Sequence, residues 1–214
     1  MKGASLMSRI GVLFHGGFRP PWFSLIVTAI ATGLYLLFGP APEALVFDRE
    51  AIQHGEWWRL VTGHLVHSDL YHACWDIPAF ALLAIMLEQI DRRGTIIVSL
   101  LAILTINVWL WLGTPNLLRY AGLSGVINGI FTFLLYRLWQ RRPHIVIAMM
   151  AIGYMTKLVV EAFSGQALLT NTLWPSVPSV HLAGVAAAVI LIIIEKLRKP
   201  HYSYSWTDIG TTRI

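Results

Sequence analysis

Six long apolar segments restrict what this 214-residue chain can fold into. A helix needs about 20 predominantly apolar residues to cross the hydrocarbon core of a bilayer. With 56% hydrophobic and 13% charged residues, the chain is too apolar for a soluble domain of its size. The connections are short, without a linker or an internal repeat. The sequence therefore predicts an all-α membrane protein, one six-helix bundle with spans at about 22–39, 70–90, 95–113, 124–140, 144–163 and 179–197.

This pattern divides the chain into a cytoplasmic N-terminal segment (1–21), a membrane domain (22–198) and a polar cytoplasmic tail (199–214). A cleavable signal peptide is the alternative for the first apolar segment, because basic residues precede it and Gly39–Ala44 follows it. However, the apolar segment is long for a signal peptide, and proline lies within the supposed cleavage site. We therefore expect this segment to be a span.

The basic residues predict the orientation of the spans, because cytoplasmic loops carry an excess of Lys and Arg. With both termini in the cytoplasm, twelve basic residues fall on that side, three fall outside and Lys157 lies in a span. The net charge of +5 thus reflects topology and contact with anionic lipid, and we predict no nucleic-acid partner. The inside residues are Lys2, Arg9, Arg19, Arg92, Arg93, Arg137, Arg141, Arg142, Lys196, Arg198, Lys199 and Arg213; the outside residues are Arg49, Arg59 and Arg119.

Ser124 and His181 lie at the outer ends of the fourth and sixth segments. Polar residues at membrane depth are costly and are usually kept for function. The N–H groups and dipole at the start of the helix favour a developing oxyanion near Ser124, and Gly122 permits a tight turn before it. A helix N-cap would also explain the serine, and a buried hydrogen-bonded side chain would explain the histidine. Their matching depth favours a nucleophile and its general base.

Small residues follow both polar residues at helical spacing. Gly125 and Gly129 form a stripe on the fourth segment, and Gly184 and Ala188 share a face with His181 on the sixth. Packing of the two stripes would bring the backbones together. We therefore expect these helices to carry Ser124 and His181 into hydrogen-bonding reach.

A second polar cluster, His64, His67, His72 and Asp76, lies at the start of the second segment. His72 and Asp76 are i, i+4 and face the same way. These side chains suit oxyanion donation or bracing of the loop. The alternative is a metal site, but the chain has no H-E-x-x-H motif and no glutamate placed near these histidines as a base. We predict no metal and no cofactor.

Three motifs, in order on spans two, four and six, resemble the rhomboid family of intramembrane serine proteases. They are His67-x4-His72-x3-Asp76, Gly122-x-Ser124-Gly125 and His181-x2-Gly184-x3-Ala188. Trp58-Arg59 resembles a Trp-Arg pair of the same family. Each motif is weak alone, but the combination is specific and covers about residues 45–190. The compact size and the Trp-Asp pair at 75–76 resemble the rhombosortases, a bacterial subgroup.

The resemblance implies a rhomboid-like bundle in a bacterial inner membrane, with an active site that opens to the outer side. It implies a Ser–His dyad without a third acid, in which Ser124 is the nucleophile and His181 the general base. It also implies that His72 and residue 76 help to form the oxyanion hole and that His67 is structural. The family usually has Asn at the position of Asp76 and Gly at that of Ala188. Alanine is still small, whereas a carboxylate changes the chemistry of the hole.

Two states of Asp76 suit an oxyanion hole. A protonated Asp76 would donate a hydrogen bond directly. An ionised Asp76 would accept from His72 and orient that ring, so that its other nitrogen donates to the oxyanion. The i, i+4 spacing favours the ionised state, because a hydrogen-bonded pair leaves no charge unmatched.

These features predict an intramembrane serine endopeptidase that cleaves a peptide bond in or next to the transmembrane segment of a protein substrate. Substrate must enter from the lipid bilayer and unwind locally, because a helix hides its carbonyl groups. The rhombosortase likeness implies substrates with a C-terminal Gly-Gly-type membrane anchor, cut before sorting. The alternative is a catalytically inactive rhomboid-like scaffold for quality control, against which the intact Ser124 and His181 argue. A transporter would need a polar path at the midplane, which is nearly all apolar here.

Lys157 and Glu161 are i, i+4 near the outer end of the fifth segment. This spacing predicts an internal ion pair or a lysine that extends to the membrane surface. A place on the substrate path is the alternative.

Overall fold

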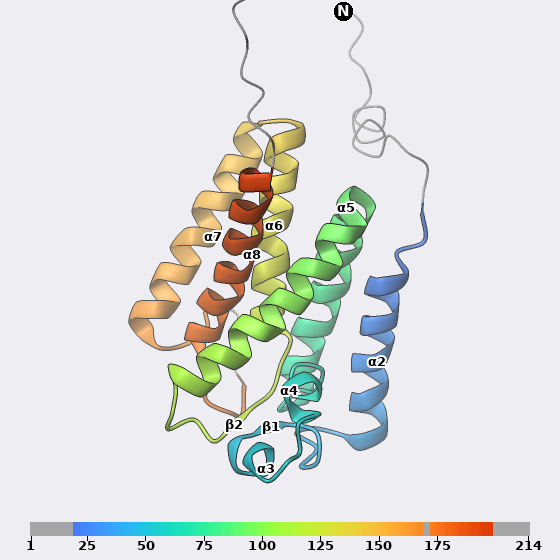
Figure 1. Ribbon diagram of the computed structural model, residues 1–214, viewed down its shortest axis with the longest axis vertical. Helices are drawn as coiled ribbons and strands as arrows, with labels where there is room; N and C mark the ends of the chain where they lie inside the picture. The colour runs from blue at the N-terminus through green and yellow to red at the C-terminus, as the bar shows by residue number, and fades with distance from the viewer. Residues whose placement is uncertain (1–18, 169–171, 199–214) are drawn as a thin grey trace, which may run out of the picture.

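The computed structural model describes residues 19–168 and 172–198. This part of the chain contains seven helices and two short strands (Figure 1). Most of the predicted N-terminal segment and the whole predicted tail lie outside these residues. The helices are α2 (Trp22–Phe38), α3 (Arg49–Gln53), α4 (Arg59–Thr62), α5 (Leu70–Leu112), α6 (Ser124–Arg141), α7 (Ile145–Ser164) and α8 (Pro178–Arg198); the strands are β1 (Phe47–Asp48) and β2 (Arg119–Tyr120).

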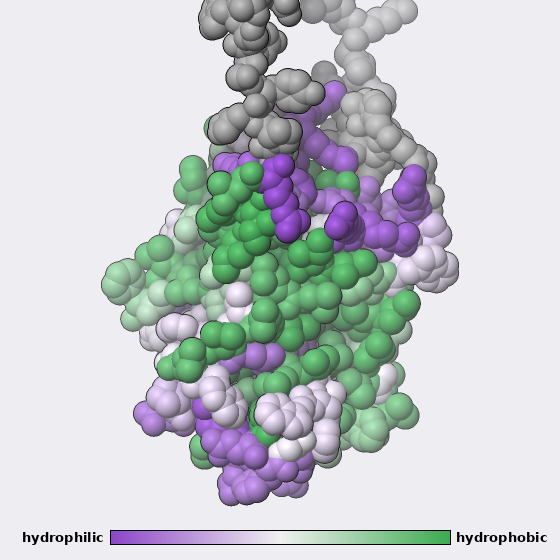
Figure 2. Space-filling view, in the orientation of Figure 1, coloured by the Kyte–Doolittle hydropathy of each residue, from purple (hydrophilic) through white to green (hydrophobic). Residues whose placement is uncertain are grey.

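Three of the described helices, α5, α7 and α8, are long and apolar enough to cross a membrane. Helix α2 is apolar but shorter, with 17 residues. Figure 2 shows apolar residues across the middle of the molecule and hydrophilic residues toward both ends of its described part. Lipid tails can cover such a surface, whereas water would not. The chain is therefore an integral membrane protein of all-α class, and the count of six spans remains a prediction.

Helix α5 doubles back at Asp91, whose backbone angles (φ −154°, ψ 84°) interrupt the helix (Figure 1). Its two arms occupy the second and third apolar segments. Asp91 Oδ1 accepts a hydrogen bond from Gly94 N at 2.8 Å and so caps the second arm. Arg137 of α6 donates to Asp91 Oδ2 and to Glu195 Oε1 of α8, each at 2.6 Å. This ion cluster joins α5, α6 and α8 at one end of the bundle.

A buried carboxylate attaches α2 to the bundle. Glu88 of α5 accepts hydrogen bonds from Ser24 N at 2.9 Å and Ser24 Oγ at 2.7 Å. It also accepts one from Phe23 N at 3.3 Å. These groups lie in the first turn of α2, where N–H groups have no intrahelical acceptor. Glu88 therefore caps the neighbouring helix, and Arg92 balances its charge at 3.0 Å.

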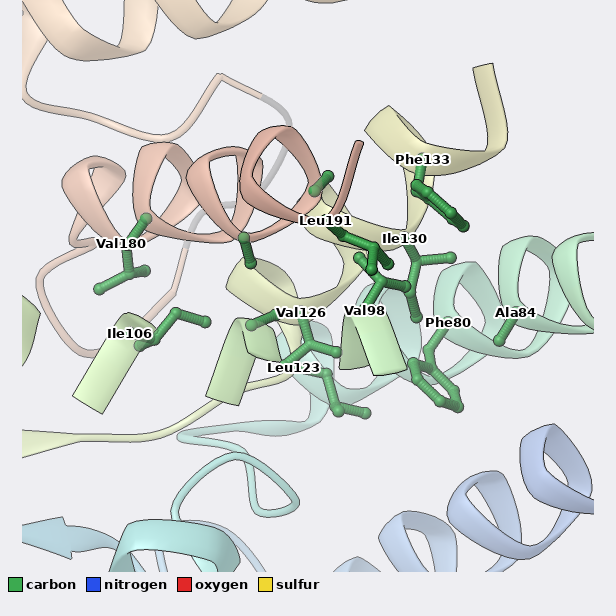
Figure 3. Packing of buried hydrophobic residues seen from close by; sticks show 14 of the residues in the cluster. Phe80, Ala84, Val98, Ile106, Leu123, Val126, Ile130, Phe133, Val180 and Leu191 are labelled. Atoms are coloured by element: carbon green, nitrogen blue, oxygen red, sulfur yellow. The ribbon is translucent and has the colours of Figure 1, made fainter. Parts of the chain in front are cut away.

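The apolar core lies between α5, α6 and α8 (Figure 3). It is built from aliphatic and phenylalanine side chains that the three helices direct inward, including Phe80, Ile106, Ile130 and Phe133, each at most 1% exposed. Helix α6 packs against both other helices and against α7. Because Ser124 is the first residue of α6 and His181 lies in the first turn of α8, this core fixes the positions of both.

The two strands join the loop between α2 and α5 to the segment that precedes α6. Strand β1 pairs antiparallel with β2, so that Phe47 lies opposite Tyr120 and Asp48 opposite Arg119. Arg119 Nε lies 3.0 Å from Asp48 Oδ2 and adds an ion pair to the ladder. The approach to Ser124 is thus tied to residues more than 70 positions earlier.

Arg59 supports the same loop through hydrogen bonds. Its guanidinium is buried and donates to Val46 O at 3.0 Å, to Glu43 O and to Glu56 Oε2. Three acceptors in a fixed arrangement suit the forked donor geometry of arginine. The adjacent Trp58 is 52% exposed, and its Nε1 donates to Ala44 O at 3.0 Å. The Trp-Arg pair therefore organises the loop at 43–46.

Candidate active site

A cavity of about 350 Å³ lies where α5, α6 and α8 begin. All three helices have their N-termini at the same end of the bundle (Figure 1). Ser124, His181 and His72 line this cavity together. The other lining residues come from the segment before α5, the segment before α6, the segment between α7 and α8 and the first turn of α8: Ser68, Leu117, Arg119, Tyr120, Ala121, Ala167, Thr172, Trp174, Pro175, Ser176, Val177 and Val180.

Ser124 is the first residue of α6 and is half-buried. The N-cap position belongs to Leu123, which is in the αR region and makes no side-chain cap hydrogen bond. The N-cap explanation of Ser124 is therefore wrong, and the residue lines the cavity beside Tyr120. Its carbonyl oxygen accepts from Asn128 Nδ2 at 2.7 Å, and Asn128 Oδ1 accepts from Tyr154 at 2.9 Å. Asn128, which fixes the first turn of α6, was not predicted from the sequence.

Gly122 allows the chain to turn into α6. Its φ of +129° is a conformation that side chains disfavour. An added Cβ would also lie only 2.7 Å from His72 Cε1 and 2.8 Å from His72 Nε2. Its N–H donates to Gly63 O at 3.0 Å. The glycine therefore serves both the turn and the close approach of His72 to the segment before Ser124.

His181 lies in the first turn of α8 and is 6% exposed. Its Nδ1 lies 2.9 Å from Glu161 Oε2 of α7. A carboxylate only accepts hydrogen bonds, so Nδ1 carries the proton and Nε2 keeps its lone pair when the ring is neutral. The predicted ion pair of Glu161 with Lys157 is also present, at 2.8 Å. The contact of this pair with His181 was not predicted from the sequence.

Glycines bring α6 and α8 into backbone contact beside the cavity. A Cβ on Gly184 would overlap Gly125 O and would lie 2.9 Å from Gly125 C. A Cβ on Gly129 would lie 2.8 Å from Gly184 O. Ala188, one turn further along α8, is fully buried. Ser124 and His181 line one cavity, although no direct hydrogen bond joins them among the described residues.

His72 is held through both nitrogens of its ring. Ser68 Oγ lies 3.0 Å from Nδ1 and donates its own proton to Asp69 Oδ2 at 2.7 Å, so it must accept from His72. Nε2 lies 3.1 Å from Asp76 Oδ2. This differs from the expectation that the second nitrogen is free to face an oxyanion. The reason is that Ser68, four residues before His72, already contacts Nδ1 of the ring.

The proton count of this cluster follows from its contacts. Both nitrogens of His72 face acceptor oxygens, yet a neutral imidazole carries only one proton. Ser68 therefore takes the Nδ1 proton, and Nε2 contacts Asp76 Oδ2 without a hydrogen bond of good geometry among the described residues.

The other two histidines of the cluster are buried and neutral. Burial lowers the pKa of His64 and of His67 to about 4, so neither carries a charge at pH 7. His67 Nε2 lies 3.8 Å from Asp76 Oδ2, too far for a hydrogen bond. His64 Nε2 contacts Asn107 Oδ1 at 3.3 Å and does not line the cavity. Among the described residues, no three His, Cys, Asp or Glu side chains are arranged to hold a metal ion.

Asp69 and Tyr120 complete the polar surroundings of the cavity. Burial alone would raise the pKa of Asp69, but hydrogen bonds from His72 N, Leu173 N and Ser68 Oγ lower it, so it is ionised at pH 7. Burial raises the pKa of Tyr120 and the Asp76 carboxylate adds to the rise, whereas the neighbouring Ser124 side chain acts in the opposite direction. Tyr120 is therefore a neutral hydroxyl beside Ser124, and it donates to Gly122 O at 2.9 Å.

Comparison with known proteins gives one family. The family model described as Rhomboid domain matches residues 54–197, which is about two thirds of the chain. The matched range begins before Trp58-Arg59 and includes Ser124, His181 and the cluster from His67 to Asp76. No curated protein matches the chain.

Proposed function

Because this chain belongs to the rhomboid family of intramembrane proteases, we propose that it is a serine endopeptidase with Ser124 as nucleophile and His181 as general base. The observation that carries the proposal is the shared cavity, which both side chains enter from helix ends whose backbones touch at Gly125 and Gly184. His181 Nδ1 is occupied, so Nε2 is the nitrogen available to a hydroxyl. Ser124 and His181 are not hydrogen bonded to each other in the described structure, and substrate binding can bring the two side chains together.

The reaction proceeds in two steps. Ser124 Oγ attacks the carbonyl carbon of the scissile bond while its proton moves to His181 Nε2. The C–N bond then breaks, and His181 gives that proton to the departing amine, which leaves an acyl ester on Ser124. Water attacks the ester carbon, its proton passes through His181 to Ser124 Oγ, and the second product leaves as a carboxylic acid.

The oxyanion of each tetrahedral intermediate lies at the start of α6 in this proposal. The Ser124 N–H is in the first turn, where no intrahelical acceptor exists, and the helix dipole is positive there. His72 lines the same cavity beside Gly122 and is the second group that we assign to the oxyanion hole. Removal of one such donor in a serine protease costs about 100- to 1,000-fold in kcat.

The substrates we propose are transmembrane or membrane-anchored proteins that reach the site from the bilayer. Both termini of the enzyme lie in the cytoplasm of a bacterial cell, its six spans cross the inner membrane and its cavity opens to the outer side. The excess of basic residues in the predicted cytoplasmic segments supports this orientation. Processing of C-terminally anchored proteins for sorting is the narrower possibility that the Trp-Asp pair at 75–76 supports.

Covalent labelling of Ser124 tests the proposal against an inactive scaffold. A fluorophosphonate probe should label the purified wild-type protein in detergent or lipid, and mass spectrometry should place the adduct on Ser124. Labelling should be lost in Ser124→Ala and reduced in His181→Ala, because the probe needs an activated hydroxyl. A folded wild-type protein that neither takes the label nor cleaves a transmembrane substrate would support the scaffold instead.

The contact of His72 with Asp76 predicts unequal effects of substitution. Asp76→Asn should keep activity within about tenfold of wild type, because an amide can contact His72 and also donate to the oxyanion. His72→Ala should cost about 100-fold or more, the cost of a lost oxyanion donor. The kcat/KM of both variants should be measured from pH 6 to about pH 10.

The relative loss of activity in the two variants tests these roles. Equal damage from the two substitutions at all pH values would contradict this account of the oxyanion hole.

A further inference from the structure

Glu161 is a buried carboxylate beside His181 that the proposed dyad does not use. It is 1% exposed and lies near the end of α7. Its Oε2 contacts both His181 Nδ1 at 2.9 Å and Lys157 Nζ at 2.8 Å, and its Oε1 accepts from Leu168 N at 2.9 Å. Such a charge, taken out of water at a helix end, requires these partners to be stable.

We propose that Glu161 is a positioning residue for catalysis, which makes Ser124, His181 and Glu161 a triad with its members on α6, α8 and α7. This inference rests on the proposed protease function and assigns it a third residue. Its basis is the contact geometry: one carboxylate oxygen meets the nitrogen of His181 that does not take part in proton transfer. Because that nitrogen is fixed as a donor, Nε2 has the lone pair that Ser124 needs.

Glu161 also compensates the charge that the reaction creates. When Ser124 attacks, His181 becomes an imidazolium in a buried site, where an isolated cation is costly. The carboxylate in direct contact stabilises that cation, as the third residue of a serine protease triad does. No proton needs to move to Glu161; the proton of Ser124 stays on His181 until it passes to the leaving amine.

Lys157 weakens the effect of the carboxylate on His181. Both donors bind Oε2, so the ammonium opposes the field of the carboxylate at the imidazole. Lys157 is also the more exposed partner, with its side chain 24% exposed against 2% for Glu161. The carboxylate contacts the ring directly, whereas no described hydrogen bond or ion pair joins Lys157 to His181, so the net field at His181 is that of the carboxylate.

The other titratable or charged groups around this pair are few among the described residues. Tyr154 of α7 interacts with Glu161 through space and is hydrogen bonded to Asn128. Across the cavity, His72, Tyr120 and Arg119 face the same space as His181. None of these three contacts His181 among the described hydrogen bonds and ion pairs, so Glu161 is the charge that acts on the ring directly.

Two substitutions that remove one charge each test the proposal through the pH–rate profile. In Glu161→Gln, kcat should fall at least about tenfold with KM nearly unchanged, and the acidic limb of kcat/KM should move to lower pH. The amide keeps the shape but cannot stabilise the imidazolium, so the base accepts its proton only in more acidic solution. Lys157→Gln is the matched control and should move the acidic limb to higher pH, because it removes the opposing cation.

A purely structural role for Glu161 predicts a different result. Loss of the contact to Leu168 would lower thermal stability and the amount of active enzyme, but it would not shift the acidic limb of the kcat/KM profile. Glu161→Asp restores the charge and should return the limb toward its wild-type position, even if its kcat stays low.

The proposal is overturned if active Glu161→Gln and Lys157→Gln have the same acidic limb as the wild type. If Glu161→Gln does not fold, Glu161→Asp and Lys157→Gln still test the proposal. The acidic limb of Lys157→Gln can move to higher pH only if the Glu161 carboxylate acts on His181. Failure of the proposed function looks different: the wild type itself would show neither cleavage nor fluorophosphonate labelling, and both proposals would fall together.

Discussion

Ser124→Ala is expected to abolish peptide-bond cleavage while the protein still inserts and folds. The substitution removes one hydroxyl oxygen from a residue that lines the cavity and makes no cap hydrogen bond, so α6 should begin as before. The loss should be about 10,000-fold or more in kcat, since removal of a nucleophile leaves only binding and oxyanion stabilisation. The measurement is cleavage of a transmembrane substrate by purified protein in lipid vesicles, with helicity and melting temperature as controls for folding.

His181→Ala should reduce cleavage to a similar extent, and the double variant should be no worse than either single one. Residues that act as one unit show this non-additivity. His181→Ala leaves Glu161 paired with Lys157 and Leu168, so its fold should persist. Proteolysis by purified Ser124→Ala at a rate above its preparation background would contradict the assignment of the nucleophile.

Much of the fold could be predicted from the sequence because the bilayer limits the possible structures. Apolar segments of membrane length must be helical, since every backbone polar group needs a partner within the segment. The predicted starts at residues 22, 70 and 124 agree with those of α2, α5 and α6, and the helix starts at 145 and 178 lie one residue away from the predictions. The predicted break between the second and third segments is a kink at Asp91, because the Asp91 carboxylate caps the arm that follows directly.

The contacts of the candidate site were harder to predict because they depend on helix rotation. The i, i+4 pairs Lys157–Glu161 and His72–Asp76 follow from helix geometry alone, and the structure contains both. The contact of Glu161 with His181 joins two helices, and the sequence does not specify how α7 turns relative to α8. Ser68 was missed for a related reason: it lies in the segment before α5, whose course depends on Asp69 as the helix cap.

Gly184→Val should destabilise the protein and reduce its activity together. A Cβ at this position would overlap Gly125 O and would lie 3.2 Å from Gly129 N. These are backbone atoms within helix α6, so they cannot rotate away as a side chain would. The two helices must therefore separate or tilt, at a cost of about 3 kcal/mol or more. For a protein of this size the cost corresponds to a melting temperature roughly 6–12 °C lower.

The activity of Gly184→Val should fall because α6 and α8 carry Ser124 and His181, and a shift of about 1 Å in a catalytic pair can cost 100-fold. Gly129→Val should destabilise similarly with a smaller effect on activity, since Gly129 lies a turn deeper than Ser124. Gly153→Val is the matched control: it adds the same atoms to a membrane helix, but no atom lies within 4 Å of its Cβ. Melting temperature and kcat/KM should therefore fall in Gly184→Val and stay near wild type in Gly153→Val. If Gly184→Val matched the control in both measurements, α6 and α8 would not be in backbone contact, and the geometry that brings Ser124 toward His181 would be wrong.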